Sequence, residues 1–155
     1  MNVTSLTELK KSTWKVTAST TMTFNDELQI PENAIDGVCR RGSLNVFISG
    51  RKSMDWLQIE FPRRVEAIKG VVVSKRTISD YAGFSDVELR IGNRDESGQG
   101  VVQLSGNPLV GRFDGPVHGE KMAVFQLAER PESGKFLTLQ RISGRLTVDE
   151  VFINI

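Results

Sequence analysis

One short stretch, ENAIDGVCRRGS from Glu32 to Ser43, concentrates residue types that could do chemistry. Asn33 and Asp36 carry oxygens that can point into a turn at Gly37, and Ser43 adds a hydroxyl group. Hard cations such as calcium take about six to eight oxygen ligands, many of them backbone carbonyls, so an irregular loop with one or two carboxylates suits them. An Asx-type turn that only reverses the chain would have the same composition, and this stretch alone favours that simpler interpretation.

Catalytic and zinc chemistry finds little support elsewhere in the chain. The only histidine, His118, has neither a cysteine nor an acid at metal-ligand spacing, and a zinc site needs more nitrogen and sulfur ligands than the sequence offers. A nucleophilic triad would depend on this same histidine. The adjacent acids Asp149 and Glu150 would point to opposite faces of a strand, which does not suit the paired carboxylates of glycoside hydrolysis. The sequence therefore predicts a protein that is not an enzyme.

Charge and composition argue against other classes of partner. The chain has 155 residues with 20 Lys and Arg against 19 Asp and Glu, so its net charge of +1 creates no overall attraction to nucleic acid. No apolar run approaches the roughly 18 residues of a membrane helix, and we expect no membrane insertion. The single cysteine, Cys39, cannot form an internal disulfide. This length fits one domain over residues 14–155, after a polar segment, 1–13, that we expect to be flexible.

Short apolar segments with period-two alternation recur between Gly, Asn, Asp, Ser and Pro, whereas helical periodicity is nearly absent. This pattern predicts an all-β fold, a jelly-roll β-sandwich of about eight antiparallel strands. Two connections are long, residues 20–55 and the glycine-rich residues 92–121, and long loops on a rigid sandwich are frequent binding sites. The expected strands are 14–19, 55–61, 65–74, 87–91, 101–104, 122–127, 135–139 and 145–153.

Several motifs follow one another in a recognisable order along most of the chain. They are NAIDG from Asn33, GS from Gly42, DWLQIE from Asp55, VVVSKR from Val71, DVELRIG from Asp86, GKFLTL from Gly134 and LTVDEV from Leu146. Their order resembles the galactose-binding-like β-sandwich family, which includes discoidin and coagulation-factor C domains. Within that family the fucolectin branch is the most similar, and the resemblance covers about residues 14–155.

The resemblance implies a structural calcium ion near one end of the sandwich. Val38 and Asp149 stand where fucolectins use main-chain carbonyls, so the different side chains are tolerable there. Glu150 is the most important ligand implied, because a carboxylate on the last strand would bring charge to the first loop. The implied calcium ligands are Asn33, Asp36, Val38, Ser43, Asp149 and Glu150.

The sugar site of the fucolectins has only part of its counterpart in this sequence. In that branch one histidine and two arginines grip the sugar hydroxyl groups, and only one arginine finds a match, Arg76. The position of the second arginine falls on Gly83, and that of the histidine falls near Val46 in a shortened loop. The resemblance is therefore consistent with a retained scaffold and a changed ligand.

Cationic and aromatic residues lie in or beside the loops that the resemblance places at one end of the sandwich. Bidentate arginine contacts could hold a sulfated or sialylated glycan or an acidic protein, and a solvated rim neutralised by nearby aspartates is an equal alternative. The ring of Tyr81 could stack on a sugar face. The candidate ligand-binding residues are Arg40, Arg41, Arg51, Lys52, Arg76 and Tyr81.

Three functions remain open from the sequence. The first is a calcium-stabilised module that binds an anionic or fucosylated glycan on a cell or matrix surface. The second is a protein-binding adhesion or receptor module on the same fold, and the third is an accessory carbohydrate-binding domain of a larger enzyme. An extracellular or cell-surface location is implied by the family alone, and an oligomer is possible because many lectins gain avidity by assembling.

Overall fold

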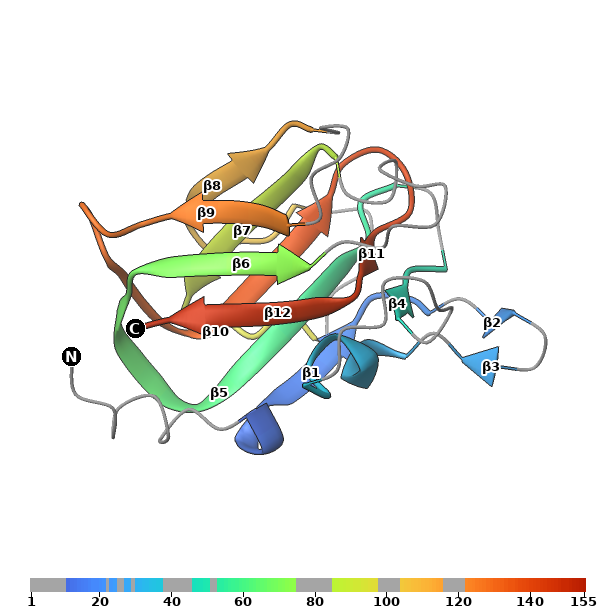
Figure 1. Ribbon diagram of the computed structural model, residues 1–155, viewed down its shortest axis with the longest axis horizontal. Helices are drawn as coiled ribbons and strands as arrows, with labels where there is room; N and C mark the ends of the chain where they lie inside the picture. Colours follow the sequence, from blue (N-terminus) through green and yellow to red (C-terminus); the bar gives the residue numbers. More distant parts are fainter. Residues whose placement is uncertain are drawn as a thin grey trace.

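Two antiparallel sheets face each other in the computed structural model, which describes residues 11–21, 23–24, 27–28, 30–37, 46–50, 53–74, 85–97, 104–115 and 122–155 (Figure 1). The larger sheet has the strand order β1-β5-β10-β7-β8, and the smaller has the order β12-β6-β9. This arrangement confirms the predicted all-β jelly-roll sandwich. The strands are β1 (Lys15–Ala18), β5 (Trp56–Ile68), β10 (Glu132–Arg141), β7 (Val87–Gly92), β8 (Leu109–Phe113), β12 (Glu150–Asn154), β6 (Gly70–Ser74) and β9 (Met122–Gln126).

Shorter elements lie around the two sheets. One small pair joins β4 (Phe47–Ile48) to β11 (Thr147–Val148), and another joins β2 (Thr23–Phe24) to β3 (Glu27–Leu28). Two single 3-10 turns are η1 (Lys11–Thr13) and η2 (Pro31–Ala34). Within the ranges that the structure describes, no helix has the length and apolar character needed to cross a bilayer.

The core lies between the sheets and follows the alternation of the sequence. On β5, the side chains of Leu57, Ile59 and Phe61 are at most 1% exposed, as expected for one apolar face. The opposite sheet contributes Val71 and Val73 from β6, its central strand. Val72 points to the outer face between Phe152 and Val124 and is only half-buried, so one face of β6 is covered and the other is not.

The first large correction concerns the corner between the sheets. One strand was expected over residues 65–74, but β5 continues to Ile68 and β6 begins in the other sheet at Gly70. The sequence pattern does not indicate the change of sheet at Lys69, because apolar residues precede and follow this lysine. Pro62 is tolerated inside β5 because pairing with β1 ends at Glu60 and the register with β10 is irregular between Glu60 and Val65.

The second correction concerns the glycine-rich residues 92–121, which were expected to form one long loop. They contain β8, an edge strand that pairs with β7. β8 lacks a clear apolar alternation, because Leu109 is 50% exposed and Gly111 replaces a side chain where the strand meets Phe125. A Cβ atom on Gly111 would lie 2.9 Å from the Phe125 ring, so only glycine fits this approach.

Other expected strands also differ in their bounds, β10 among them, since it extends beyond the expected 135–139 at both ends. Of the strand expected over residues 101–104, only Leu104 is described, and it lies outside any strand. The strand expected over residues 145–153 is divided at Asp149, because β11 pairs with β4 whereas β12 pairs with β6. This division turns out to matter for the site, since it creates the corner on which Asp149 and Glu150 lie.

Candidate functional site

The turn that follows η2 positions the first two residues of the expected metal site. Pro31 starts the 3-10 turn, and the N–H of Ile35 closes it by donating to the carbonyl of Glu32 at 3.1 Å. Gly37 then has a φ of +83°, a left-handed conformation that favours glycine, and its N–H reaches Glu150 on the last strand. Asn33 donates from its amide nitrogen to the carbonyl of Val46 at 3.3 Å, so its amide oxygen is the atom it could offer to an ion.

The corner between β11 and β12 positions the other two described residues, Asp149 and Glu150, and both are fully buried. The carboxylate of Asp149 accepts a hydrogen bond from the hydroxyl of Ser74 at 2.8 Å. Its backbone N–H donates to the Ser74 carbonyl at 3.0 Å, which docks the corner onto the end of β6. The family pattern implies that Asp149 would offer an ion its main-chain carbonyl.

Glu150 meets groups from two distant parts of the chain. Its Oε2 atom accepts hydrogen bonds from the backbone N–H of Gly37 at 3.1 Å and from the ammonium group of Lys11. Its Oε1 atom is buried and has no hydrogen-bond partner among the described residues. Burial is the main cause that raises the pKa of Glu150 to about 7; Lys11 and Gly37 oppose this shift, and the adjacent Asp36 side chain adds to it.

Of the four described residues of the expected metal site, the structure places the Asp36 side chain beside Glu150. Asn33 lies in η2 with its amide on Val46, and the Asp149 carboxylate is on Ser74. Two neighbouring carboxyl groups fit a hard cation, and one of them has a buried oxygen, Glu150 Oε1, without a hydrogen-bond partner among the described residues. The cation would neutralise the pair, and main-chain carbonyls would complete the coordination shell of the ion. Within the described ranges, no cluster of three or more His, Cys, Asp or Glu side chains could hold a metal, so main-chain oxygens would have to complete the site. The other two implied ligands, Val38 and Ser43, lie outside the described residues.

The candidate ligand-binding residues Arg40, Arg41, Arg51, Lys52, Arg76 and Tyr81 also lie outside the described residues. The residues on either side of these loops are described, and hydrogen bonds connect them at one end of the sandwich (Figure 1). Ser74 at the end of β6 meets Asp149, while Ser49 just after β4 donates to the carbonyl of Leu146 at 2.9 Å. The three loops therefore begin and end at the same end of the sandwich as Glu150.

Arg141, at the end of β10, fixes the base of these loops, although no sequence pattern marked it. Its side chain is buried and donates to the carbonyl and the hydroxyl of Ser85, both at 2.9 Å, and to the carbonyl of Arg145. Gly144 leaves room for the guanidinium, because a Cβ atom there would lie 2.6 Å from the Arg141 Cζ atom. The buried cation thus holds the start of β7 against the turn that leads to β11.

Two residues beside the loops have a backbone conformation that is unusual for a residue other than glycine. Met54, before β5, has a φ of 62°, and Asp86, before β7, has a φ of 52°. Both are held by the end of β10: the Met54 carbonyl accepts from Gln140 Nε2 at 2.9 Å, and the Asp86 carbonyl accepts from Ile142 N at 3.0 Å. The strained backbone therefore lies where β10 fixes the entry into two strands.

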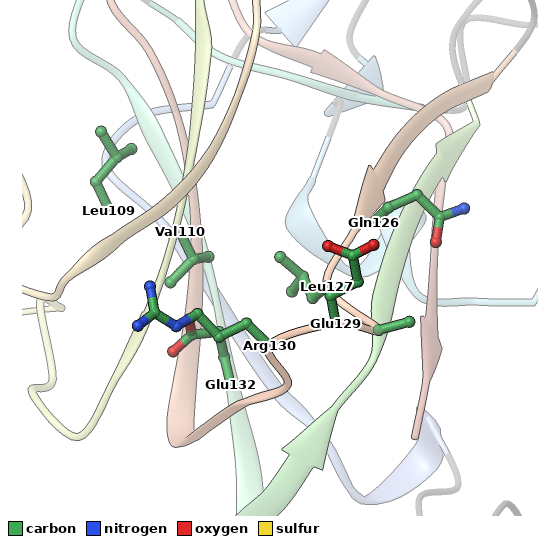
Figure 2. Close-up of a pocket in the computed structure, with 8 residues that line it drawn as sticks. Leu109, Val110, Gln126, Leu127, Glu129, Arg130 and Glu132 are labelled. Carbon is green, nitrogen blue, oxygen red and sulfur yellow. The ribbon is translucent and has the colours of Figure 1, made fainter.

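Two hollows lined by described residues lie elsewhere on the molecule. A groove of about 710 Å³ opens between β8 and the turn after β9, with Val110 and Leu127 in its apolar part and Arg130 beside it (Figure 2). It lies at the end where Gly70 pairs with Gln126, opposite the end where Ser74 pairs with Met122. A polar cleft of about 330 Å³ lies on the outer face of β1 and β5. Neither hollow is lined by a residue that the sequence singled out.

The fold was compared with known proteins. No family model matches the sequence, and no curated protein matches it significantly. Solved structures do match: a fucolectin from striped bass (Morone saxatilis) serum superposes with a TM-score of 0.75 at 19% identity, covering 94% of this chain and 47% of that chain. The chain thus spans about half the length of the striped bass protein.

Two bacterial modules are similar over nearly their whole length. The Streptococcus pneumoniae fucose binding module SpX-3 has a TM-score of 0.70 at 17% identity, covering 92% of this chain and 94% of the module. The family 32 CBM from Clostridium perfringens NanJ, solved in complex with galactose, has a TM-score of 0.69 at 12% identity, covering 94% and 96%. This chain therefore has the galactose-binding-like β-sandwich fold of fucolectins and carbohydrate-binding modules.

The buried contacts of Arg141 predict that it is important for stability. Replacing it with alanine should lower the free energy of unfolding by about 3 kcal/mol, because hydrogen bonds of a charged donor are lost and buried acceptors stay unsatisfied. Urea denaturation measures the change. The matched control is Arg112→Ala, whose guanidinium is 44% exposed beside Asp86 and Asp114 and should matter far less. Equal effects of the two substitutions would contradict the assigned role of Arg141.

The raised pKa of Glu150 predicts how stability depends on pH without metal. The folded protein holds the proton up to about pH 7, whereas an unfolded glutamate releases it near 4.5. The folded state therefore binds more protons between these values, and the stability contributed by Glu150 falls as the pH rises through 7. Thermal melts in EDTA from pH 5 to 8 should show wild type losing stability relative to Glu150→Gln. Parallel pH profiles of the two proteins would disprove this titration.

Proposed function

We propose that this chain is a non-catalytic, calcium-stabilised recognition module that binds carbohydrate through the loops at the Glu150 end of the sandwich. The observation that carries the proposal is the likeness, over more than nine-tenths of this chain, to a fucolectin, a fucose binding module and a CBM in complex with galactose. A glycan on a cell or matrix surface is the partner, and the module acts outside the cell.

The ligand class follows from the residues that the loops carry. Arg40, Arg41, Arg51, Lys52 and Arg76 supply cationic donors, and Tyr81 supplies a ring that can cover a sugar face. Such a set suits a glycan with an anionic group, such as a sulfate or a sialic acid carboxylate. Because the histidine and one arginine of the fucolectin pattern are missing, fucose alone would engage only Arg76.

The calcium part of the proposal is supported by the chemistry around Glu150. Asp36 and Glu150 place two carboxylates side by side, and the buried Glu150 Oε1 atom has no partner within the described part of the chain. Asn33, Asp36 and Glu150 would hold the ion with side-chain oxygens, while Val38, Ser43 and Asp149 would complete its shell. The ion would neutralise the carboxylates and fasten the first loop to β12.

Calcium is therefore expected to stabilise the fold. At a calcium concentration near 100 times its dissociation constant, the free energy of unfolding should rise by about 2.7 kcal/mol if only the folded state binds the ion. Thermal melts in EDTA and in millimolar calcium measure this, and the metal content after dialysis shows whether an ion was retained. Glu150→Ala should remove the calcium effect. A wild-type melting temperature that calcium leaves unchanged, in protein shown to be metal-free, would refute the site.

Glycan recognition is expected to depend on the loop arginine. On a glycan array in calcium, the protein should bind sulfated or sialylated structures, and Arg76→Ala should reduce that signal at least tenfold, as loss of a good bidentate contact does. The matched control is Arg64→Ala, on the far part of β5, where Arg64 donates to the Ser133 hydroxyl at 2.8 Å.

The array also separates this proposal from a protein-binding role. If Arg64→Ala binds like wild type while Arg76→Ala does not, the loop end of the sandwich is the binding surface. If wild type binds no glycan at high protein density but captures one specific protein through Arg76, the carbohydrate proposal fails and the recognition module is protein-specific.

A further inference from the structure

Lys11 lies against the carboxylate that we propose as the main calcium ligand. Its ammonium group pairs with Glu150 Oε2 and lies 4.3 Å from the centre of the Phe152 ring, two residues further along β12. The side chain is only 22% exposed, although lysine usually extends into solvent. The 3-10 turn η1 fixes its backbone, because the N–H of Trp14 donates to the Lys11 carbonyl at 3.1 Å.

The two oxygens of Glu150 are used unequally. Oε2 accepts from Lys11 and from the Gly37 N–H, while Oε1 has no hydrogen-bond partner in the described part of the chain. Asp36 brings a second carboxylate to the same place. One ammonium group thus faces two carboxyl groups, and when both are ionised it offsets one of the two negative charges that a divalent ion would neutralise.

We propose that Lys11 is a built-in counter-ion of the Asp36–Glu150 pair and that its docking opposes calcium binding. The inference rests on the proposed calcium site. Without metal, the ammonium group compensates the buried carboxylate and fastens the N-terminal turn to β12. When calcium binds beside the same carboxylate, two like charges share a poorly screened place and repel each other. The coupling is reciprocal: docked Lys11 lowers the affinity for calcium, and bound calcium lowers the equilibrium constant for Lys11 docking by the same factor.

The first test measures calcium affinity by isothermal titration in metal-free protein. Lys11→Met keeps an unbranched chain of similar length and removes the charge, so calcium should bind about tenfold tighter or more, given the size of such repulsion even in a watery environment. The matched control, Lys15→Met, changes an exposed lysine on β1 and should bind calcium like wild type. Lys11→Arg keeps the charge and should also stay near the wild-type affinity. An affinity that Lys11→Met leaves unchanged or weakens would overturn the proposal.

The second test needs no substitution at Lys11. The Trp14 amide donates the hydrogen bond that closes η1. Its hydrogen exchange in wild type should become faster when calcium is added, by the factor by which calcium lowers the equilibrium constant for Lys11 docking. Slower or unchanged exchange at saturating calcium would contradict negative coupling. This readout holds even if Lys11→Met folds poorly.

The outcomes distinguish this inference from the proposed calcium site. If wild type binds no calcium but Lys11→Met does, Lys11 acts as proposed and simply outcompetes the ion. If neither protein binds calcium, and Lys11→Met in EDTA melts at the same temperature as Lys15→Met, both the calcium site and the counter-ion role are refuted. If wild type binds calcium and Lys11→Met binds it no more tightly, the calcium site stands and the opposition by Lys11 falls.

Discussion

A buried carboxylate at the start of the last strand is the constraint on which both ends of this chain depend. An ionised group removed from water is costly unless charges and hydrogen-bond donors surround it. Glu150 is fully buried and recruits Lys11 from the start of the described chain and Gly37 from the first loop, 139 and 113 residues away in sequence. The N-terminal turn, the first loop and β12 therefore form one electrostatic unit, in which the buried carboxyl group is either protonated or paired with a cation.

A second anchor of the opposite charge holds the other side of the same end. Arg141 meets the carbonyl and hydroxyl oxygens of Ser85 and the carbonyl of Arg145, so this buried cation is stabilised by dipoles. Together the two anchors fix the entry and exit points of the loops, while the loop sequences between those points remain free to differ. This division of labour is consistent with a fold shared at 12–19% identity by a fucolectin, a fucose binding module and a CBM solved in complex with galactose.

The sandwich could be predicted from the sequence because period-two alternation survives wherever one face of a strand is buried, as in Leu57, Ile59 and Phe61. The prediction failed where the local sequence pattern does not match the tertiary environment. At Lys69 the apolar run continues across a change of sheet, and in β8 a glycine serves close packing against Phe125 while Leu109 stays exposed. Within the candidate site, the proximity of the NAIDG segment to Glu150 was expected from the family resemblance. Lys11 and Arg141 carried no signal, because Glu150 lies 139 residues from Lys11 and Ser85 lies 56 residues from Arg141.

The position of the carboxylate pair also indicates how an ion would affect ligand binding. Gly37 and Val46 flank the segment 38–45. The Asn33 amide, on the Gly37 side of the segment, donates to the Val46 carbonyl on the other side. Both ends of the segment that carries Arg40 and Arg41 are thus held within one small region beside Glu150. Ordering a loop costs conformational entropy whenever it occurs, and ordering it during folding removes that cost from binding. A cation at Asp36 and Glu150 would therefore favour ligand binding without touching the ligand, by holding the base of the arginine loop in place before the ligand arrives.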